Sequence, residues 1–131
     1  MENLTDRKLL RNYVLKEKKG TGQISDVYRA KNLKKCVNVV VKILQRDASR
    51  NQSLLKYFSG EANLMSTFEH PNIVRFYDFY HQKNLVLIVM DWVDGSNLWD
   101  FIRSRNKPFN LKETVRILDP VCSVLNCAHS P

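Results

Sequence analysis

The sequence predicts an α+β fold, in which a five-stranded antiparallel sheet with one packed helix is followed by a connector and further helices. Three observations predict it: β-branched residues alternate along 37–44, apolar residues recur every three or four positions along 51–68, and glycines join two strand-like runs near residue 20. A chain of 131 residues is long enough for one core and is one domain at most. Residues 1–12 show no clear period, so we expect a leader or a short helix there.

The strand 37–44 places a lysine, Lys42, on a face otherwise built from Val and Leu. Burying an unpaired ammonium is costly, so Lys42 needs an anionic partner or ligand unless it snorkels to the surface. Helical spacing supplies a partner, because Glu61 lies three residues after Phe58 and four before Met65, inside the apolar stripe of the predicted helix. We therefore expect an ion pair between Lys42 and Glu61.

Two glycines join the strand-like runs 13–18 and 27–31. Gly20 and Gly22 have no Cβ and can adopt positive φ, so the backbone of this hairpin can approach a phosphate closely. An ordinary hairpin turn would explain the same glycines. The glycines together with Lys42 and Glu61 are a more specific signal than the glycines alone, since the strand lysine follows about twenty residues later and the helical glutamate about twenty after that.

The remaining elements follow from turn residues and periodicity. We expect a polar turn at 32–35, a polar connection at 45–52, a strand from 72 to about 80, a turn at 81–84 and a continuous apolar strand at 85–90. A short helix is predicted at 97–105, and a second helix begins at Asn110, where Glu113 completes a capping-box pattern. Pro120 lies inside that helix, so we expect a bend or break near 116–119.

The positive charge is concentrated in the first half of the chain. Residues 1–60 carry 14 Lys and Arg against 5 Asp and Glu, whereas residues 61–131 carry 7 against 8. Nucleic-acid binding is one interpretation of this excess. The basic residues alternate with strand-core positions, however, which favours a solvated sheet face whose potential also suits a polyphosphate. We therefore expect no nucleic-acid partner.

Cellular location and metal binding are read from what the sequence lacks. Three cysteines stand without metal-ligand spacing, which is typical of free thiols in a reducing compartment and predicts no metal site. No apolar run approaches the ~20 residues of a membrane span, and the N-terminus has no signal-peptide segment. These features favour a cytoplasmic protein without a membrane segment.

Taken together, these motifs resemble the first half of a serine/threonine protein kinase domain of the bacterial type. Gly20–Val27 stands at the family's glycine-rich loop, and Val39–Lys42 reads Val-Val-Val-Lys where the family has Val-Ala-Ile-Lys. Glu61 falls at the family's helix glutamate. His70–Val74 matches the turn after that helix, and Ala128–Ser130 is similar to the end of the helix that precedes the catalytic loop.

The resemblance implies a domain division and an ATP site. The implied division is a leader at 1–12, a kinase N-lobe at 13–90, a hinge at 91–97 and a truncated start of the C-lobe at 98–131. The implied ATP-binding residues are Gly20, Thr21, Gly22, Gln23, Ile24, Ser25, Val27, Val40, Lys42, Met90, Asp91, Val93 and Asn97. Within this set Lys42 would bind the α- and β-phosphates, and Glu61, through its ion pair, would position the lysine.

The resemblance also implies how the adenosine part would be held. Val27 and Val40 would sandwich the adenine ring, and Met90 would be the gatekeeper behind it. The carbonyl of Asp91 and the N–H of Val93 would bond the adenine edge. A polar residue at the end of the hinge, Asn97, would contact the ribose.

Two site positions depart from the family pattern, and two further apolar positions match the family but can also be explained as ordinary core. Ser25 replaces the third glycine, and Val40 replaces a small alanine, which narrows the adenine pocket. Met65 and Phe76 stand at positions of the hydrophobic spine that links the kinase lobes. They are equally well explained as ordinary core residues.

The sequence contains no catalytic-loop aspartate, no Mg²⁺-binding motif and no activation segment. We therefore expect ATP binding without a catalytic residue, Mg²⁺ only together with a C-lobe, and no phosphoryl transfer by this chain alone. A full-length form would act on a protein substrate. The exposed stripe of the last helix predicts that residues 111–131 are poorly ordered or self-associating.

A second class of function stays open. The chain could be a non-catalytic kinase-like module, or a truncated remnant, that binds nucleotide or a protein partner. Retention of Lys42 and Glu61 favours descent from an active enzyme, because a scaffold has no need of a buried ion pair.

Overall fold

A computed structural model describes residues 8–9, 12–83 and 85–130, and these residues form two compact units. The first unit contains the described residues of Met1–Thr67 together with Val74–Trp92. The second contains Phe68–Ile73 and the described residues of Val93–Pro131. No described helix combines the length and the apolar character that crossing a bilayer requires.

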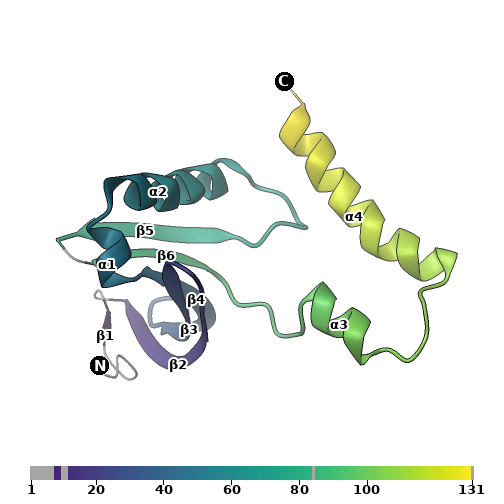
Figure 1. The fold of residues 1–131 in the computed structure, drawn as a ribbon, viewed down its shortest axis with the longest axis horizontal. Coiled ribbons are helices and arrows are strands. Elements are labelled where there is room, and N and C mark those ends of the chain that lie inside the picture. The colour runs from purple at the N-terminus through teal and green to yellow at the C-terminus, as the bar shows by residue number, and fades with distance from the viewer. Residues whose placement is uncertain (1–7, 10–11, 84, 131) are drawn as a thin grey trace. The chain divides into compact units, whose positions relative to one another are not determined.

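The first unit is built on an antiparallel sheet, which has six strands among the described residues (Figure 1). The strands are β1 (Lys8–Leu9), β2 (Tyr13–Thr21), β3 (Ser25–Asn32), β4 (Val37–Leu44), β5 (Phe76–Gln82) and β6 (Leu85–Asp91). Their spatial order is β1-β2-β3-β4-β6-β5, so β4 lies between β3 and β6. The five expected strands are present, and the two-residue β1 extends the sheet at the β2 edge.

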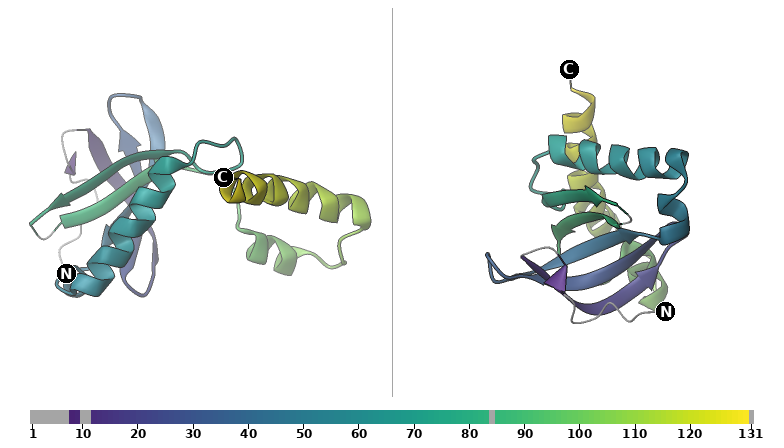
Figure 2. Two further views of the ribbon diagram at one scale, coloured as in Figure 1. Left: turned by 90° about the horizontal axis from the view of Figure 1, so that it is seen from above. Right: turned by 90° about the vertical axis from the view of Figure 1, so that its left-hand side faces the viewer.

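Helix α2 (Gln52–Thr67) is the predicted amphipathic helix, and it runs alongside β5 (Figures 1 and 2). Its Phe58 and Ala62 are buried with Leu44, Val86 and Ile88 in one core cluster. The opposite face of the sheet holds a second cluster, made of Tyr13, Leu15, Tyr28, Ala30, Val39, Val41, Ile43, Leu87 and Val89. Because side chains alternate between the two faces along each strand, the sheet has a hydrophobic core on each face.

Two early segments contain elements that the sequence did not predict. Lys8–Leu9 forms β1 and not the short helix that was one of two expectations for 1–12, because these residues pair in antiparallel register with Val14 and Tyr13. The rest of the expected leader, apart from Asn12, lies outside the described residues. The polar connection 45–52 contains a short helix, α1 (Arg46–Ser49), whose Ala48 is buried in the cluster around Phe58. Burial of that alanine overrides the polar composition of the segment.

The strand after the α2 turn begins later than predicted. Residues 72–75 are not strand, because Ile73 N–H donates to the carbonyl of His70 and closes a turn. β5 starts at Phe76 and continues to Gln82. The expected turn at 81–84 therefore narrows to Lys83, which has a φ of 49°; Asn84 lies outside the described residues.

The second unit contains α3 (Leu98–Ser104) and α4 (Leu111–His129). The predicted capping box is present, since Asn110 Oδ1 accepts from Glu113 N–H and Glu113 Oε2 accepts from Asn110 N–H, both at 2.9 Å. Arg105 joins the two helices by pairing with Glu113 at 3.0 Å and stacking 4.2 Å from the centroid of the Phe109 ring. The turn after α2 contacts α4 through His70 Nε2 and Ser123 Oγ, 3.1 Å apart.

Of the bend or break expected near 116–119, the break does not occur, because α4 runs without interruption from Leu111 to His129 (Figure 2). Proline removes a single N–H donor, and the helical partner of that donor would be the carbonyl of Arg116. Arg116 is exposed, so water can bond its carbonyl in place of the missing N–H. One lost hydrogen bond on a solvated face therefore does not end the helix.

Candidate functional site

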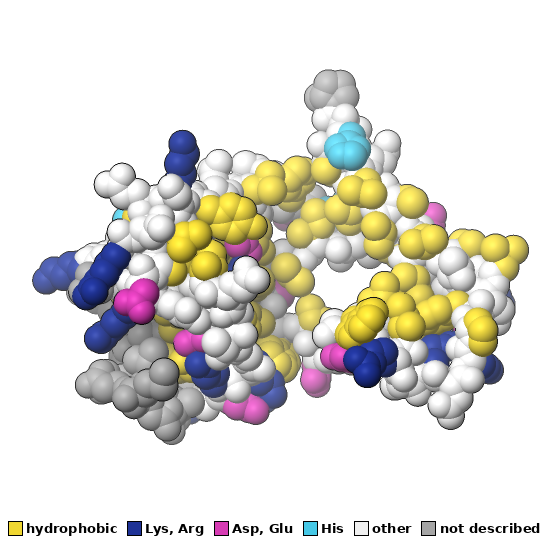
Figure 3. Space-filling view, viewed as in Figure 1, with side chains coloured by type: hydrophobic (Ala, Val, Ile, Leu, Met, Phe, Trp, Pro, Cys, Tyr) yellow, Lys and Arg dark blue, Asp and Glu magenta, His cyan; other side chains and the backbone are white. Residues whose placement is uncertain are grey.

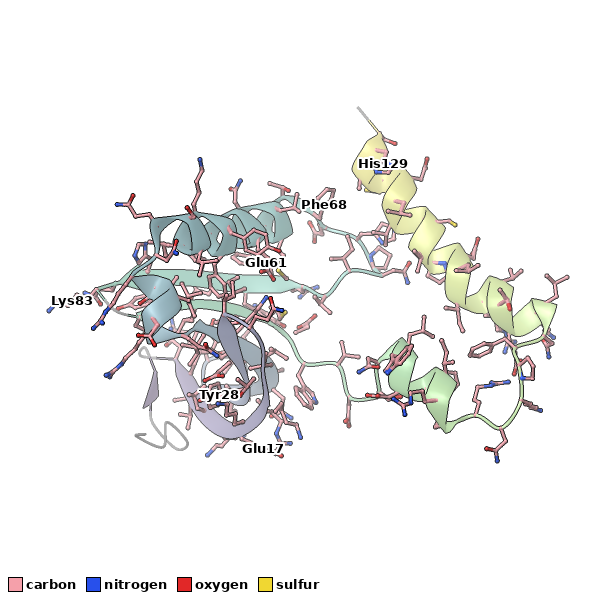
Figure 4. The ribbon with its side chains drawn as sticks, in the orientation of Figure 1. Glu17, Tyr28, Glu61, Phe68, Lys83 and His129 are labelled. Carbon is pink, nitrogen blue, oxygen red and sulfur yellow. The ribbon has the colours of Figure 1, made fainter. Side chains whose placement is uncertain are left out.

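The site is organised around the ion pair that the sequence predicts. β4 carries Lys42 in register with Val27 on β3 and Ile88 on β6. From α2, Glu61 points toward the sheet (Figure 4) and accepts from Lys42 Nζ through both carboxylate oxygens, at 2.7 and 2.9 Å. The side chain of Lys42 remains 25% exposed and that of Glu61 31% exposed, so the lysine is held in position but is still open to a ligand. The ring of Phe58 adds a cation–π contact, with its centroid 5.6 Å from Nζ.

Three other predicted residues share the sheet face of Lys42. Val27 is paired with Lys42, Val40 lies two residues before it on the same strand, and Met90 is paired with Val40. Cross-strand partners and alternate residues point to the same side of a sheet. All three side chains are half-buried. The structure thus brings an apolar surface and a fixed cation together on one face.

The hairpin between β2 and β3 carries the two glycines, and its geometry shows which property of glycine it uses. No described glycine has a positive φ. Gly22 is needed for a close approach instead, because its N–H donates to the carbonyl of Ser25 at 2.8 Å and an added Cβ would stand 3.2 Å from that oxygen. Around Gly20 no atom lies within 4 Å of such a Cβ. Only one of the two glycines is therefore constrained by its surroundings in this structure.

Two residues at the tip of the hairpin, Ile24 and Ser25, are packed against the protein. Ser25 is buried, and Ile24 packs against the core cluster that contains Phe58. Thr21 and Gln23, by contrast, are exposed. The tip therefore presents backbone and polar side chains to solvent while its apolar residue faces the protein.

Asp26, at the base of the hairpin, is held as an anion. Lys18 Nζ lies 3.0 Å from its Oδ2. Burial raises the pKa of Asp26, but hydrogen bonds from Lys18, Gln45 and Thr21 outweigh burial and lower the pKa below its usual value. Sequence reasoning did not single out these partners, because they come from two separate segments, β2 and the residue after β4.

The end of β6 is fixed by side chains that the sequence did not reveal. The N–H of Asp91 donates to the carbonyl of Arg75 at 2.9 Å, and Asp91 Oδ2 accepts from Arg75 N–H at 3.3 Å. A hydrogen bond to Asp91, together with burial, raises the pKa of Tyr77. The side chain of Asp91 therefore links β6 to the start of β5.

Trp92 follows Asp91, and two cations lie over its ring. Lys19 Nζ is 5.6 Å and the guanidinium carbon of Arg29 is 5.9 Å from the centroid of the Trp92 ring. Both cations also pair with Glu17, at 3.0 and 3.5 Å, respectively. The entry to the connector is therefore attached to β2 and β3. An aromatic residue after an apolar strand is the only sequence signal for this contact.

Two predicted site residues, Val93 and Asn97, belong to the second unit. Val93 is 65% exposed. Asn97 caps α3, with its Oδ1 accepting from Asp100 N–H and its Nδ2 donating to Asp100 Oδ2, both at 2.8 Å. Their expected contacts with adenine and ribose stay predictions. Within the described part of the chain, no three His, Cys, Asp or Glu side chains gather as a metal site would require.

Comparison with known proteins gives concordant results. The family model described as protein kinase domain matches residues 13–131. The serine/threonine-protein kinase PrkC of Bacillus subtilis is 33% identical over 110 residues, which covers 84% of this chain and 17% of that protein. The serine/threonine-protein kinase PknB of Mycobacterium tuberculosis is 33% identical over 131 residues, which covers 97% of this chain and 20% of that protein. The chain thus spans about a fifth of the length of these relatives.

A solved structure shows the same fold. A crystal structure of the PknI kinase domain of M. tuberculosis superimposes with a TM-score of 0.80 at 20% identity. The match covers 97% of this chain and 51% of that one. The arrangement of sheet and helices is therefore one that experiment has already established for a kinase domain.

Proposed function

Since the chain belongs to the protein kinase family, we propose that its first unit is the ATP-binding part of a serine/threonine protein kinase. The observation that carries this proposal is the bidentate hold of Glu61 on Lys42, beside the apolar face of Val27, Val40 and Met90. An ammonium that is fixed on a side chain still a quarter exposed fits an anionic ligand. An adjacent apolar surface fits a flat heterocycle.

Each part of the site has a separate task in this proposal. Lys42 binds the α- and β-phosphate oxygens, and Glu61 keeps the ammonium from swinging away. The backbone of the hairpin 20–25 covers the phosphates, which the close turn at Gly22 permits. Val27 and Val40 hold the adenine between them in front of Met90. The carbonyl of Asp91 gives the adenine edge a hydrogen bond, and the contacts expected of Val93 and Asn97 stay predictions.

Phosphoryl transfer is proposed for the whole protein and not for these residues alone. The γ-phosphoryl group would pass to a hydroxyl of a protein substrate. The sequence holds neither the catalytic-loop aspartate nor the Mg²⁺-binding motif of the family. Mg²⁺ is therefore assigned to no residue of this chain, and these residues are proposed to bind the nucleotide and orient its phosphates.

A cytoplasmic location is proposed as well. Cys36, Cys122 and Cys127 are all free thiols, which supports a reducing compartment.

ATP titration of the full chain and of two lysine variants tests the proposal. Lys42→Met removes the charge at the proposed phosphate contact and is expected to weaken ATP binding about ten- to a hundredfold, the range for hydrogen bonds to charged groups. Lys56→Met is the matched control, because Lys56 is an exposed lysine on α2. It is expected to leave the affinity unchanged. Equal affinities of wild type and Lys42→Met would overturn the assignment.

A further inference from the structure

Gln45 occupies an unusual position between the glycine hairpin and the lysine strand. It directly follows Leu44, the last residue of β4, three positions after Lys42. It also stands at the N-cap of α1, but its side chain makes no cap hydrogen bond. Glutamine is not among the favoured N-cap residues, so helix capping does not account for it.

The main chain and the side chain of Gln45 both reach the hairpin. Its N–H donates to the carbonyl of Ile24 at 2.9 Å. Its side-chain Nε2 lies 3.3 Å from the carbonyl oxygen of Gly22 and 3.3 Å from Asp26 Oδ1. One side chain therefore contacts both flanks of the hairpin tip, at Gly22 before it and at Asp26 after it.

The hairpin residues that Gln45 contacts are themselves held in place by other contacts. Asp26 pairs with Lys18 on β2 at 3.0 Å, so the carboxylate that receives Gln45 cannot easily move away. Ile24 packs into the core cluster that also contains Leu44, the neighbour of Gln45. The hairpin tip is thus joined to the end of β4 by one apolar contact, one main-chain hydrogen bond and two side-chain hydrogen bonds.

We propose that Gln45 is a positioning residue that latches the glycine hairpin to the strand bearing Lys42. The latch, made of Gln45, Asp26 and Lys18, sets the distance between the backbone that covers the phosphates and the ammonium that binds them. This inference rests on the proposed ATP site. It adds that ATP affinity depends on a residue that touches no part of the nucleotide.

The variant Gln45→Ala tests the latch in the full chain. It removes both side-chain hydrogen bonds and keeps the main-chain bond to Ile24. Gln52→Ala is the matched control, since Gln52 is an exposed glutamine at the start of α2. Two readouts are taken for each protein. The first is amide hydrogen exchange of residues 20–25 without nucleotide, and the second is the affinity for ATP and for adenosine.

Gln45→Ala is expected to speed exchange of the 20–25 amides about two- to tenfold, as the loss of about one net hydrogen bond implies. ATP affinity should fall by a similar factor, while adenosine affinity should not change because adenosine has no phosphates for the hairpin to cover. Gln52→Ala should match wild type in both readouts. Unchanged exchange in Gln45→Ala, or an equal fall for ATP and adenosine, would overturn the latch.

The two proposals fail in different ways. If wild type binds neither ATP nor adenosine, the proposed function is wrong, whereas hydrogen exchange still decides whether the latch exists. If Gln45→Ala does not fold, Gln45→Glu replaces it. This variant keeps the length of the side chain but sets a second carboxylate against Asp26 and the Gly22 carbonyl. It is expected to open the hairpin, and a hairpin that exchanges as in wild type would contradict the latch.

Discussion

Glu61 holds Lys42 through both carboxylate oxygens, yet neither side chain is fully buried. Ion pairs with this much exposure contribute little to folding, because water and salt screen them. The pair is therefore better explained by the position that it gives the ammonium than by the stability that it gives the fold.

Glu61→Gln separates these two roles. The variant keeps the shape of the side chain but removes its charge, so Lys42 is held less firmly. ATP affinity is expected to fall about tenfold, while the free energy of unfolding changes by less than about 1 kcal/mol. Nucleotide titration and denaturant unfolding of the same sample measure both quantities. A large loss of stability with unchanged affinity would assign the pair to the fold instead.

The two hairpin glycines provide a matched comparison. In Gly22→Ala the added Cβ stands 3.2 Å from the Ser25 carbonyl, so the turn must shift, whereas in Gly20→Ala the Cβ meets no atom within 4 Å. We expect faster amide exchange at residues 20–25 in Gly22→Ala and wild-type exchange in Gly20→Ala, both without nucleotide. If the two variants behave alike, the close turn is not what constrains the hairpin.

At this scale the sequence predicted some contacts and missed others. The Lys42–Glu61 pair could be found because period-two and helical spacing each assign a side chain to a face. The contacts of Gln45 and Trp92 could not, because they depend on how separate strands come into register. The glycines do not use the positive φ that they can adopt, and the close contact of Gly22 with Ser25 depends on the exact turn geometry, which composition alone does not specify.

The bounds of β4 and α2 were the most predictable from the sequence, and the short elements α1 and β1 were the least predictable. β4 and α2 both have long, regular apolar patterns, and their observed bounds lie within a residue or so of those expected. α1 and β1 are too short to leave a pattern, and they are formed by burial of Ala48 and by pairing with β2. α4 continues past Pro120 because the affected carbonyl can be hydrated.

The start of α4 is expected to respond to acid. The backbone hydrogen bond from Asn110 and the side-chain bonds from Arg105 lower the pKa of Glu113 below its ordinary value of 4.5. A carboxyl with a lowered folded pKa stabilises the helix above its unfolded pKa, and that contribution is lost as the pH falls through the folded value.

Amide exchange at the first turn of α4, followed from pH 6 downward, measures this response. We expect fraying to begin below about pH 4.5 in wild type, beyond the intrinsic change in exchange rate. Glu113→Gln should show the same fraying at every pH, since the amide side chain does not titrate. A first turn whose protection does not depend on pH in wild type would contradict the capping account.

At the scale of the whole molecule, the two units differ in how they bury apolar surface. The first has a core on each face of its sheet. In the second, hydrophobic side chains gather on the surface of α3 and α4 (Figure 3). The exposed ones are Leu98, Trp99, Phe101, Ile102, Leu111, Val115, Leu118, Val121 and Leu125. Residues 111–129 form a helix, and their self-association stays a prediction.

The central claim is that one lysine among many faces the phosphates of ATP. An acyl-phosphate derivative of ATP tests it directly, because a nearby amine attacks the acyl carbon, forms an amide and releases ATP. Mass spectrometry then identifies the modified lysine. We predict modification at Lys42 that free ATP suppresses and that Gln45→Ala reduces. Modification spread over the exposed lysines, unaffected by ATP, would contradict the account.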